Sequence, residues 1–529
     1  MRHAFPIGWR PQEAGGVLVQ FIDVPKGMPT VPPGSGPTRA CLQPTNPLIV
    51  GLTSGRIEYP KMIRSSDRMM RVRNAKRNLL RSKNVNGIVC QRNMECLMAD
   101  NVTHLPRPRA VRPAPELLGL YVRAGRNDHK ELLNLLSAGD LRCFGVVIDA
   151  LHVNRHRELR EQVVDYGLDA VLDPKTQVAA TIGGYTEALG ELPWGLDRPH
   201  RVSDFVGRGG RERMAQLGDF AIEHGFTQVL APTHLLQDAD DPWLARDIEA
   251  SEWLRAHLDR NGGAGIPLIY SLAVPYSIFR NGAQRRLLVE ALRGVPASAI
   301  WLKVERFGSS STPTAACIYI NGAADFHELG IPIIGDHVGG LVGLGLLAFG
   351  AVGGIAHGVT MHERFDASRW RKERQPGDGW SMPKRVYLHE LDLMLKPDEA
   401  RLLLESTARA RSLFGCRDRH CCPRGVQDMF ENPARHFLYR RMEDVADLGQ
   451  TPESLRAQTF LERHLRPMTD RALAAANINW SNEAMANKTR DQRKRLDALR
   501  VALSHQREAA PPRSFASAPA RRIVRDGRG

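Results

Sequence analysis

Short apolar runs between about residues 145 and 365 repeatedly end in a carboxylate or an imidazole. Such groups are costly to place after an apolar strand unless they meet solvent or a ligand. Together they could supply a general base, a nucleophile or metal ligands, although any one of them could instead be a structural residue that caps a strand or loop. The residues concerned are Asp149, Asp173, His234, Glu305, Asp336, His337 and His357.

The segment GDHVGGLVGLG, residues 335–345, is rich in glycine and directly follows one of these runs. Backbone N–H groups in such a loop, together with the N-terminus of the helix that follows, can bind a phosphate. Gly339 and Gly340 are therefore candidate substrate-binding residues, beside the catalytic candidates Asp336 and His337. The alternative is close helix packing that requires small residues.

A metal site is predicted from Cys416, Cys421, Cys422 and His436. Structural Zn²⁺ takes four thiolate or imidazole ligands, and the spacing C-x4-C-C-x13-H places three sulfurs on one turn and the imidazole on the next helix. Three of the eight cysteines within seven residues fit a metal site better than a disulfide framework in a chain of this length. Adjacent cysteine side chains often diverge, so a cluster of free thiols is the alternative.

The elements that must position these residues alternate between β-branched runs and amphipathic helical stretches. This alternation predicts parallel strands joined by right-handed crossovers, and its seven or eight units favour a (β/α)8 TIM-type barrel over an open doubly wound sheet. In such a barrel the C-terminal ends of the strands face the active site. We predict a partly disordered extension at 1–112, the barrel at 113–370, a helical, zinc-binding subdomain that completes the barrel at 371–480, and a basic tail at 481–529.

The charge of the chain is concentrated near its ends. Its 529 residues are 42% apolar and carry a formal net charge of +15. Residues 61–83 hold nine basic residues against one acidic residue, and residues 488–529 hold twelve against four, so the rest is close to neutral. Basic segments of this kind are either solvated tails or contacts for nucleic acid. Neither a secretory signal nor a membrane-spanning run is apparent, so a cytoplasmic location is expected.

Three stretches resemble the tRNA-guanine transglycosylase superfamily: DAVLDPKTQ (169–177), the segment 227–259 and the cysteine-rich segment 416–448. The resemblance implies a (β/α)8 barrel with a zinc site of three cysteines and one histidine after the last strand. It also implies the exchange of a guanine base in tRNA or DNA for a 7-deazaguanine. Asp173 matches the acid that recognises the base in this family, and Gln177 follows it as in the family pattern.

Two departures from the family pattern change the expected roles. The family metal spacing is C-x-C-x2-C with a longer gap to the histidine. The family nucleophile is an aspartate near the last strand, but the segment GGIAHGVTMHERFD contains none before Asp366. We therefore expect Asp336 to act as the nucleophile, while Asp173 recognises or deprotonates the base. Further substrate contacts are expected from Asp149, Gln177, His234 and Glu305.

Two other functions fit the same residues. The first is a barrel enzyme acting on a small phosphorylated or carbonyl substrate through Asp336, His337 and His357. The second is a barrel without catalytic activity that binds nucleic acid through its basic ends. The expected partner is tRNA or DNA, no membrane association is expected, and a homodimer is compatible with the sequence.

Overall fold

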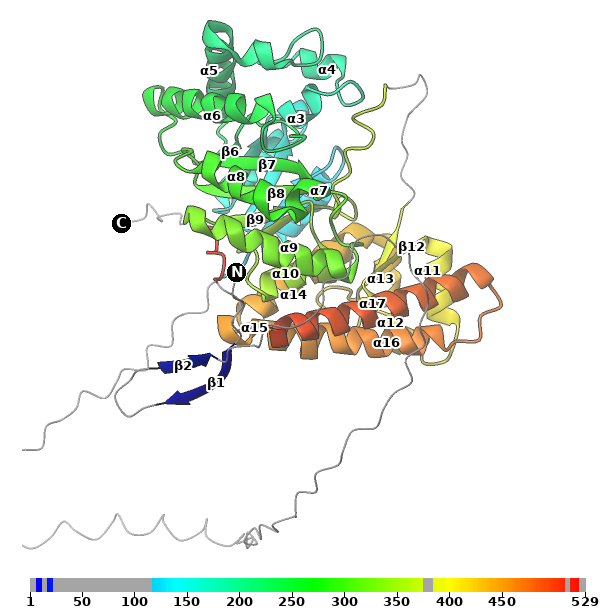
Figure 1. The fold of residues 1–529 in the computed structure, drawn as a ribbon. Coiled ribbons are helices and arrows are strands. Elements are labelled where there is room, and N and C mark those ends of the chain that lie inside the picture. The colour runs from blue at the N-terminus through cyan, green and yellow to red at the C-terminus, as the bar shows by residue number, and fades with distance from the viewer. Residues whose placement is uncertain (1–5, 12–16, 22–116, 374–383, 510–513, 523–529) are drawn as a thin grey trace, which may run out of the picture. The chain divides into compact units, whose positions relative to one another are not determined.

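The computed structural model describes residues 6–11, 17–21, 117–373, 384–509 and 514–522 (Figure 1). The chain divides into two compact units, residues 1–105 and 106–529. The first unit contributes an antiparallel hairpin of β1 (Pro6–Pro11) and β2 (Val17–Phe21). The rest of the predicted extension, including the basic run 61–83, lies outside the described residues.

Eight parallel strands of the second unit form a closed barrel, which confirms the predicted fold class. The strands pair in chain order, and the last strand closes the barrel by pairing with both its predecessor and the first strand. The strands are β3 (Gly119–Ala124), β4 (Gly145–Asp149), β5 (Asp169–Asp173), β6 (Gln228–Leu230), β7 (Leu268–Pro275), β8 (Ala299–Glu305), β9 (Ile333–Asp336) and β10 (Gly354–Gly358).

The barrel interior is filled by every second residue of the strands. Tyr121, Trp301 and Ile334 belong to one buried apolar cluster, in which the Tyr121 and Trp301 rings lie 5.0 Å apart. Because side chains alternate between the two faces of a strand, residues two positions further along point into the same interior. At the C-terminal ends of the strands this interior row consists of Arg123, Asp149, Asp173, Lys303, Glu305 and Asp336.

Helices cover the outside of the barrel, and its last helix comes from the C-terminal region. α14 (Pro433–Gly449) packs against β3, α1 and α10, so a helix from the region after β10 contributes to the helical layer. The longer helices between the strands are α1 (His129–Ser137), α2 (Arg157–Asp165), α5 (Gly207–Glu223), α6 (Pro242–Arg260), α8 (Gly282–Leu292), α9 (Pro313–Phe326) and α10 (Gly340–Ala348). The short helices α3 (Thr176–Ala179), α4 (Glu187–Gly190) and α7 (Tyr276–Arg280) also lie between strands.

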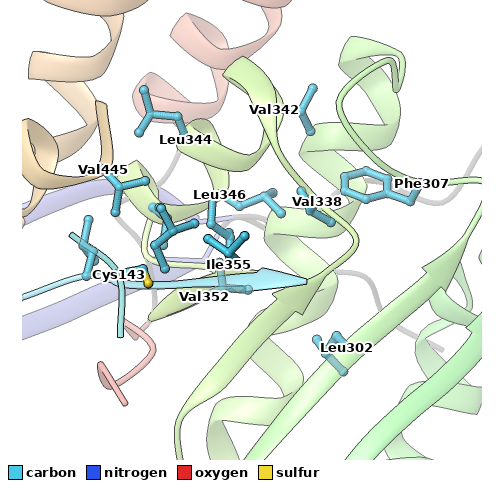
Figure 2. Close-up of a cluster of buried hydrophobic side chains, with 14 of the residues drawn as sticks. Cys143, Leu302, Phe307, Val338, Val342, Leu344, Leu346, Val352, Ile355 and Val445 are labelled. Atoms are coloured by element: carbon cyan, nitrogen blue, oxygen red, sulfur yellow. The ribbon is translucent and has the colours of Figure 1, made fainter. Parts of the chain in front are cut away.

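An apolar layer joins the barrel to these helices (Figure 2). Ile355 on β10, Leu346 on α10 and Val445 on α14 are all buried in one hydrophobic cluster. Burial of each such side chain contributes about 1.5–3 kcal/mol. The C-terminal helices are therefore part of the core of this unit.

The predicted basic tail is mostly structured. α17 (Glu483–Ala509) packs against α9 and α16 (Arg466–Ala476), and it buries Leu496, Leu499 and Leu503. Residues 514–522 run past the N-terminal ends of the barrel strands, where Ala516 donates its N–H to Gly350 O. The expectation of a solvated tail is corrected for these residues, because apolar positions spaced along the basic helix form a buried stripe.

The region after the barrel begins with short elements. Residues 397–414 form two helices, α11 (Pro397–Glu405) and α12 (Ala410–Phe414), separated by a turn. A short hairpin of β11 (Val386–Leu388) and β12 (Leu393–Leu395) precedes them. Within the described residues, none of the helices combines the length and the apolar character needed to cross a membrane.

Candidate active site at the barrel mouth

A buried arginine joins two of the predicted carboxylates at the barrel mouth. Arg123 on β3 donates from Nε and Nη2 to Asp336 at 2.7 and 2.6 Å, and from Nη1 to Asp173 at 2.7 Å. Asp173 and Asp336 lie 163 positions apart in sequence, but both end a parallel strand, so the closed barrel brings them to one face. The structure therefore brings together the two carboxylates that the sequence analysis singled out.

Asp336 is fully enclosed, with 0% of its side chain exposed. Its oxygens accept two bonds from Arg123 and the backbone N–H of His337, and Lys303 Nζ lies 3.4 Å away. Burial alone would raise the pKa of Asp336, but the charges of Arg123 and Lys303 outweigh it and hold that pKa well below its usual range. Asp336 thus accepts three hydrogen bonds and has one further ion-pair contact, which leaves little free acceptor capacity on its two oxygens.

Asp149 and Asp173 are the carboxylates that remain open to solvent. They are register partners on β4 and β5, and their side chains are 20% and 11% exposed. Lys175 Nζ lies 3.3 Å from Asp149, and its backbone N–H donates to Asp173. Burial would raise the pKa of Asp173, but Lys175, Arg123 and Lys303 together lower it far below its usual range. Asp173 is therefore an ionised acceptor at neutral pH.

Lys303 is a buried amine that the sequence analysis did not select. It lies on β8 and donates to Gln177 Oε1 at 2.8 Å. Burial lowers its pKa, although Asp336 opposes this shift. Gln177 in turn donates to Thr233 Oγ1 and Ser271 O, so this predicted substrate contact is fully engaged inside the protein. The available signal was a charged residue in the middle of the apolar run AIWLKVE.

His337 and Glu305 also lie at the mouth. His337 has a left-handed backbone with φ of 57°, and its ring lies 5.8 Å from that of Phe365. Burial holds the pKa of His337 well below its usual value, so the ring is neutral, and its Nδ1 has no hydrogen-bond partner among the described residues. Glu305 accepts two bonds from Arg371, one of them at 2.7 Å.

Two predicted histidines are not at the mouth. His357 is fully buried on the outer face of β10, where its ring lies 5.7 Å from Phe437 of α14. Its neighbour Ala356 belongs to the interior cluster, so alternation along the strand turns His357 outward. His234 is buried against Trp243 at 3.5 Å between ring centroids and is bonded to Asp247 of α6 at 2.6 Å. Both predictions are corrected: these histidines pack the helices onto the barrel.

The predicted phosphate loop is filled by carboxylates of the protein itself. Gly340 N–H donates to Glu363 and Leu341 N–H donates to Asp392, at the N-terminus of α10. A Cβ placed on Gly339 would lie 2.0 Å from Glu363 Oε1. The helix N-terminus attracts an anion as expected, but the chain supplies that anion. Gly339 and Gly340 are therefore packing residues, which was the alternative interpretation.

The predicted metal ligands converge. The sulfurs of Cys416, Cys421 and Cys422 and one nitrogen of His436 all lie within 4.8 Å of one another. His436 Nδ1 is 3.3 Å from Cys421 Sγ and 3.4 Å from Cys422 Sγ, so the adjacent cysteines do not diverge. His436 Nε2 donates to the Tyr387 carbonyl, which fixes the tautomer and leaves Nδ1 free to ligate. This donor set fits a tetrahedral metal ion.

Comparisons with known proteins give only distant similarities to solved structures. No protein-family model and no curated protein matches the chain. Among solved structures, it is similar to a GH10 xylanase from Bispora sp. MEY-1 (10% identity, TM-score 0.30), with 45% of this chain and 82% of that chain covered. It is also similar to a GH26 beta-mannanase from Bacteroides ovatus (12% identity, TM-score 0.30), with 50% of this chain and 85% of that chain covered. An aldolase is similar at 9% identity and a TM-score of 0.28, with 48% of this chain and 94% of that chain covered. The strand pairing, and not these similarities, establishes the barrel.

Proposed function

We propose that this protein is a transglycosylase-like barrel enzyme that exchanges a guanine-type base in tRNA or DNA. The observation that carries the proposal is the meeting of Asp173 and Asp336 around Arg123 at the mouth of the barrel. The convergence of three cysteines and a histidine after the last strand supports it independently. Glycosyl transfer through a carboxylate requires an acid that attacks the anomeric carbon and a second group that handles the leaving base.

In the proposed reaction, Asp336 attacks the C1′ carbon of the nucleotide and the bond from C1′ to the base breaks. The incoming base then attacks C1′ and releases Asp336, so no oxidant or energy source is consumed. One proton passes from the incoming base to the outgoing one. The low pKa of Asp173 suits it to accept N–H groups of the base rather than to carry this proton. The outgoing base leaves first and takes its proton from water, and the neutral His337, whose Nδ1 is unpartnered among the described residues, accepts the proton of the incoming base and returns it to water.

Arg123 must leave Asp336 before this attack, because it bonds to both oxygens of Asp336 in the structure. Arg123 is already shared with Asp173. A base that donates to Asp173 and offers its carbonyl oxygen to Arg123 would compete with Asp336 for this guanidinium. This coupling would link attack to the presence of substrate.

The test is base exchange measured as release of labelled guanine from tRNA and from duplex DNA. Asp336→Asn is expected to lose exchange and Asp173→Asn to reduce it, whereas Asp219→Asn, which replaces an exposed carboxylate on α5, keeps it. Mass spectrometry of the denatured enzyme would locate the covalent nucleotide on Asp336. Exchange that persists in both site variants would refute the proposed chemistry, and a nucleotide on Asp149 or Asp173 would reassign the nucleophile.

We further propose that the Cys3His cluster holds structural Zn²⁺, because three of its four ligands are buried and all four lie far from the reacting carboxylates in the sequence. Its role would be to fix the turn 416–422 onto α14. The purified protein should contain one zinc per chain, and Cys421→Ser should lose it. A metal content that is unchanged in Cys421→Ser would contradict this assignment. His420→Ala is the matched control, since His420 bonds to Asp140 outside the cluster.

A second candidate function rests on Lys303. A buried amine with a lowered pKa at the mouth of a barrel can attack a carbonyl carbon and lose water to form an imine. Borohydride reduction in the presence of pyruvate or a sugar phosphate would then fix the substrate on Lys303, and Lys303→Met would abolish this mass increase. Trapping on Lys303 together with an absence of base exchange would favour this function over the first.

A further inference from the structure

A cavity of about 670 Å³ opens beside the carboxylate cluster. It is formed by the segments that follow β6, β7, β8 and β10, so it belongs to the C-terminal mouth of the barrel. Its lining includes four arginines and one buried carboxylate: Arg280, Arg306, Arg364, Arg371 and Glu305.

The positive charge of this cavity is only partly compensated. Glu305 is bound to Arg371, and the exposed Asp366 lies near enough to interact with the arginines around it. Arg364 donates to a neutral partner, the Ser310 hydroxyl, at 3.0 Å. Within the part of the chain that the structure describes, Arg280, Arg306 and Arg364 form no ion pair. Guanidinium groups gathered in a concave site repel one another unless an anion joins them.

The cavity is also close to the reacting groups. Glu305 in its wall and Lys303 beside Asp336 are two residues apart on β8, which corresponds to about 6–7 Å along the same face of the strand. An anion in the cavity would therefore lie next to the mouth. The N–H of Arg306 donates to Phe365 O at 2.7 Å, which ties the segment after β8 to the segment after β10.

We propose that this arginine cavity binds a phosphate group in the backbone of the nucleic acid whose base enters the barrel mouth. The inference rests on the proposed function, because it assigns the substrate of the same site. Guanidinium forks match phosphate oxygens in geometry and retain their charge at all relevant pH values. The barrel mouth thus supplies contacts to the phosphate backbone of the nucleic acid close to the base site. These contacts would add to any that the basic ends of the chain make.

The experiment measures binding without turnover, using the full-length protein and a fluorescent single-stranded oligonucleotide at several salt concentrations. Arg280→Gln, Arg306→Gln and Arg364→Gln should each weaken binding. Each should also reduce the slope of log K against log salt by up to about 0.7–0.9, the loss of one phosphate contact. Arg293→Gln, an exposed arginine at the C-terminal end of α8 and so at the opposite end of the barrel, is the matched control and should leave both unchanged. Thermal unfolding would verify that every variant remains folded.

Slopes and affinities equal to wild type in all three variants would overturn the proposal. Ribose 5-phosphate is the second probe, measured by calorimetry. If its binding is lost in the variants while oligonucleotide binding is unchanged, the cavity serves a small phosphorylated compound, and the nucleic-acid assignment is overturned. Binding is measured without turnover, so it does not depend on the proposed reaction. A cavity effect on binding combined with no base exchange would refute the reaction and leave the phosphate contact standing.

Discussion

Two buried arginines of this protein each join two carboxylates, and their surroundings differ. Arg123 at the barrel mouth binds Asp173 and Asp336. Arg441 on α14 binds Glu363 and Asp392 and also donates to the Tyr387 hydroxyl. The side chain of Arg123 is 10% exposed and that of Arg441 is 7% exposed. Exposure of the arginine itself therefore does not distinguish the two regions.

The difference lies in how the carboxylates use their remaining oxygens. Glu363 and Asp392 accept N–H groups from the first turn of α10, so the Arg441 network is closed on itself. At the mouth, Asp173 is partly open and adjoins Asp149 and Lys175, which are more exposed. Glu363 and Asp392 accept three and four hydrogen bonds, whereas Asp173 accepts two, so more acceptor capacity remains for chemistry at the mouth.

The largest expected effect comes from Arg441→Leu. Removal of one partner from a buried network leaves Glu363 and Asp392 uncompensated and should lower the free energy of unfolding by about 3–5 kcal/mol. Urea denaturation measures this loss. The control is Arg142→Leu, which breaks a pair with Glu443 on the surface of α14 and should cost at most about 1 kcal/mol. Similar losses of unfolding free energy in both variants would mean that the buried Arg441 network stabilises the fold no more than a surface ion pair does.

At the mouth, Asp173→Asn should affect activity more than stability. The asparagine retains the volume and one oxygen for Arg123, but it loses a charge-assisted acceptor for the base worth about 1.5–3 kcal/mol. We expect kcat/KM for base exchange to fall about 10- to 150-fold. Steady-state kinetics and urea denaturation on the same preparation separate the two effects. A stability loss as large as that of Arg441→Leu, with unchanged kinetics, would make the two networks equivalent.

The dependence on pH should reveal the charge of Asp173. Its pKa is lower in the folded protein than the value of about 3.9 in an unfolded chain. Its ionised form therefore stabilises the fold above about pH 4, and this contribution is lost as the pH falls towards the folded pKa. The difference in free energy of unfolding between wild type and Asp173→Asn should be constant from pH 5 to 8 and decrease below pH 4. A decrease centred between pH 6 and 7 would contradict this.

The smallest expected effect is that of Tyr387→Phe, which links the Arg441 network to the Cys3His cluster. The variant loses the hydroxyl bonded to Arg441 but retains the backbone carbonyl bonded to His436. We expect a loss of about 0.5–1.5 kcal/mol in unfolding free energy and an unchanged zinc content. Denaturation and metal analysis test both parts. Loss of zinc would show that the hydroxyl also supports the metal site.

Local pattern was sufficient to predict the strands and part of the mouth. Parallel strands of a barrel end at one face, so Asp149, Asp173 and Asp336 could be predicted to meet from their positions at the ends of apolar runs. The metal ligands could also be predicted, because cysteines and a histidine at short spacing belong to one turn and the helix that follows. Lys303 could be noticed as a charged residue within an apolar strand. Its role could not be inferred from the sequence, because that role depends on its partners across the barrel.

The chain's own order of residues thus determined a closed parallel barrel, the strand ends that carry acids, and a sulfur-rich turn. Only the tertiary structure decided which charges share one arginine, why His357 faces outward, and why the glycine loop after β9 is filled by Glu363. The physical reason is that periodicity specifies which positions share a face of an element. The contacts across faces, and with them the charge and openness of each site, depend on side chains brought together from distant parts of the chain.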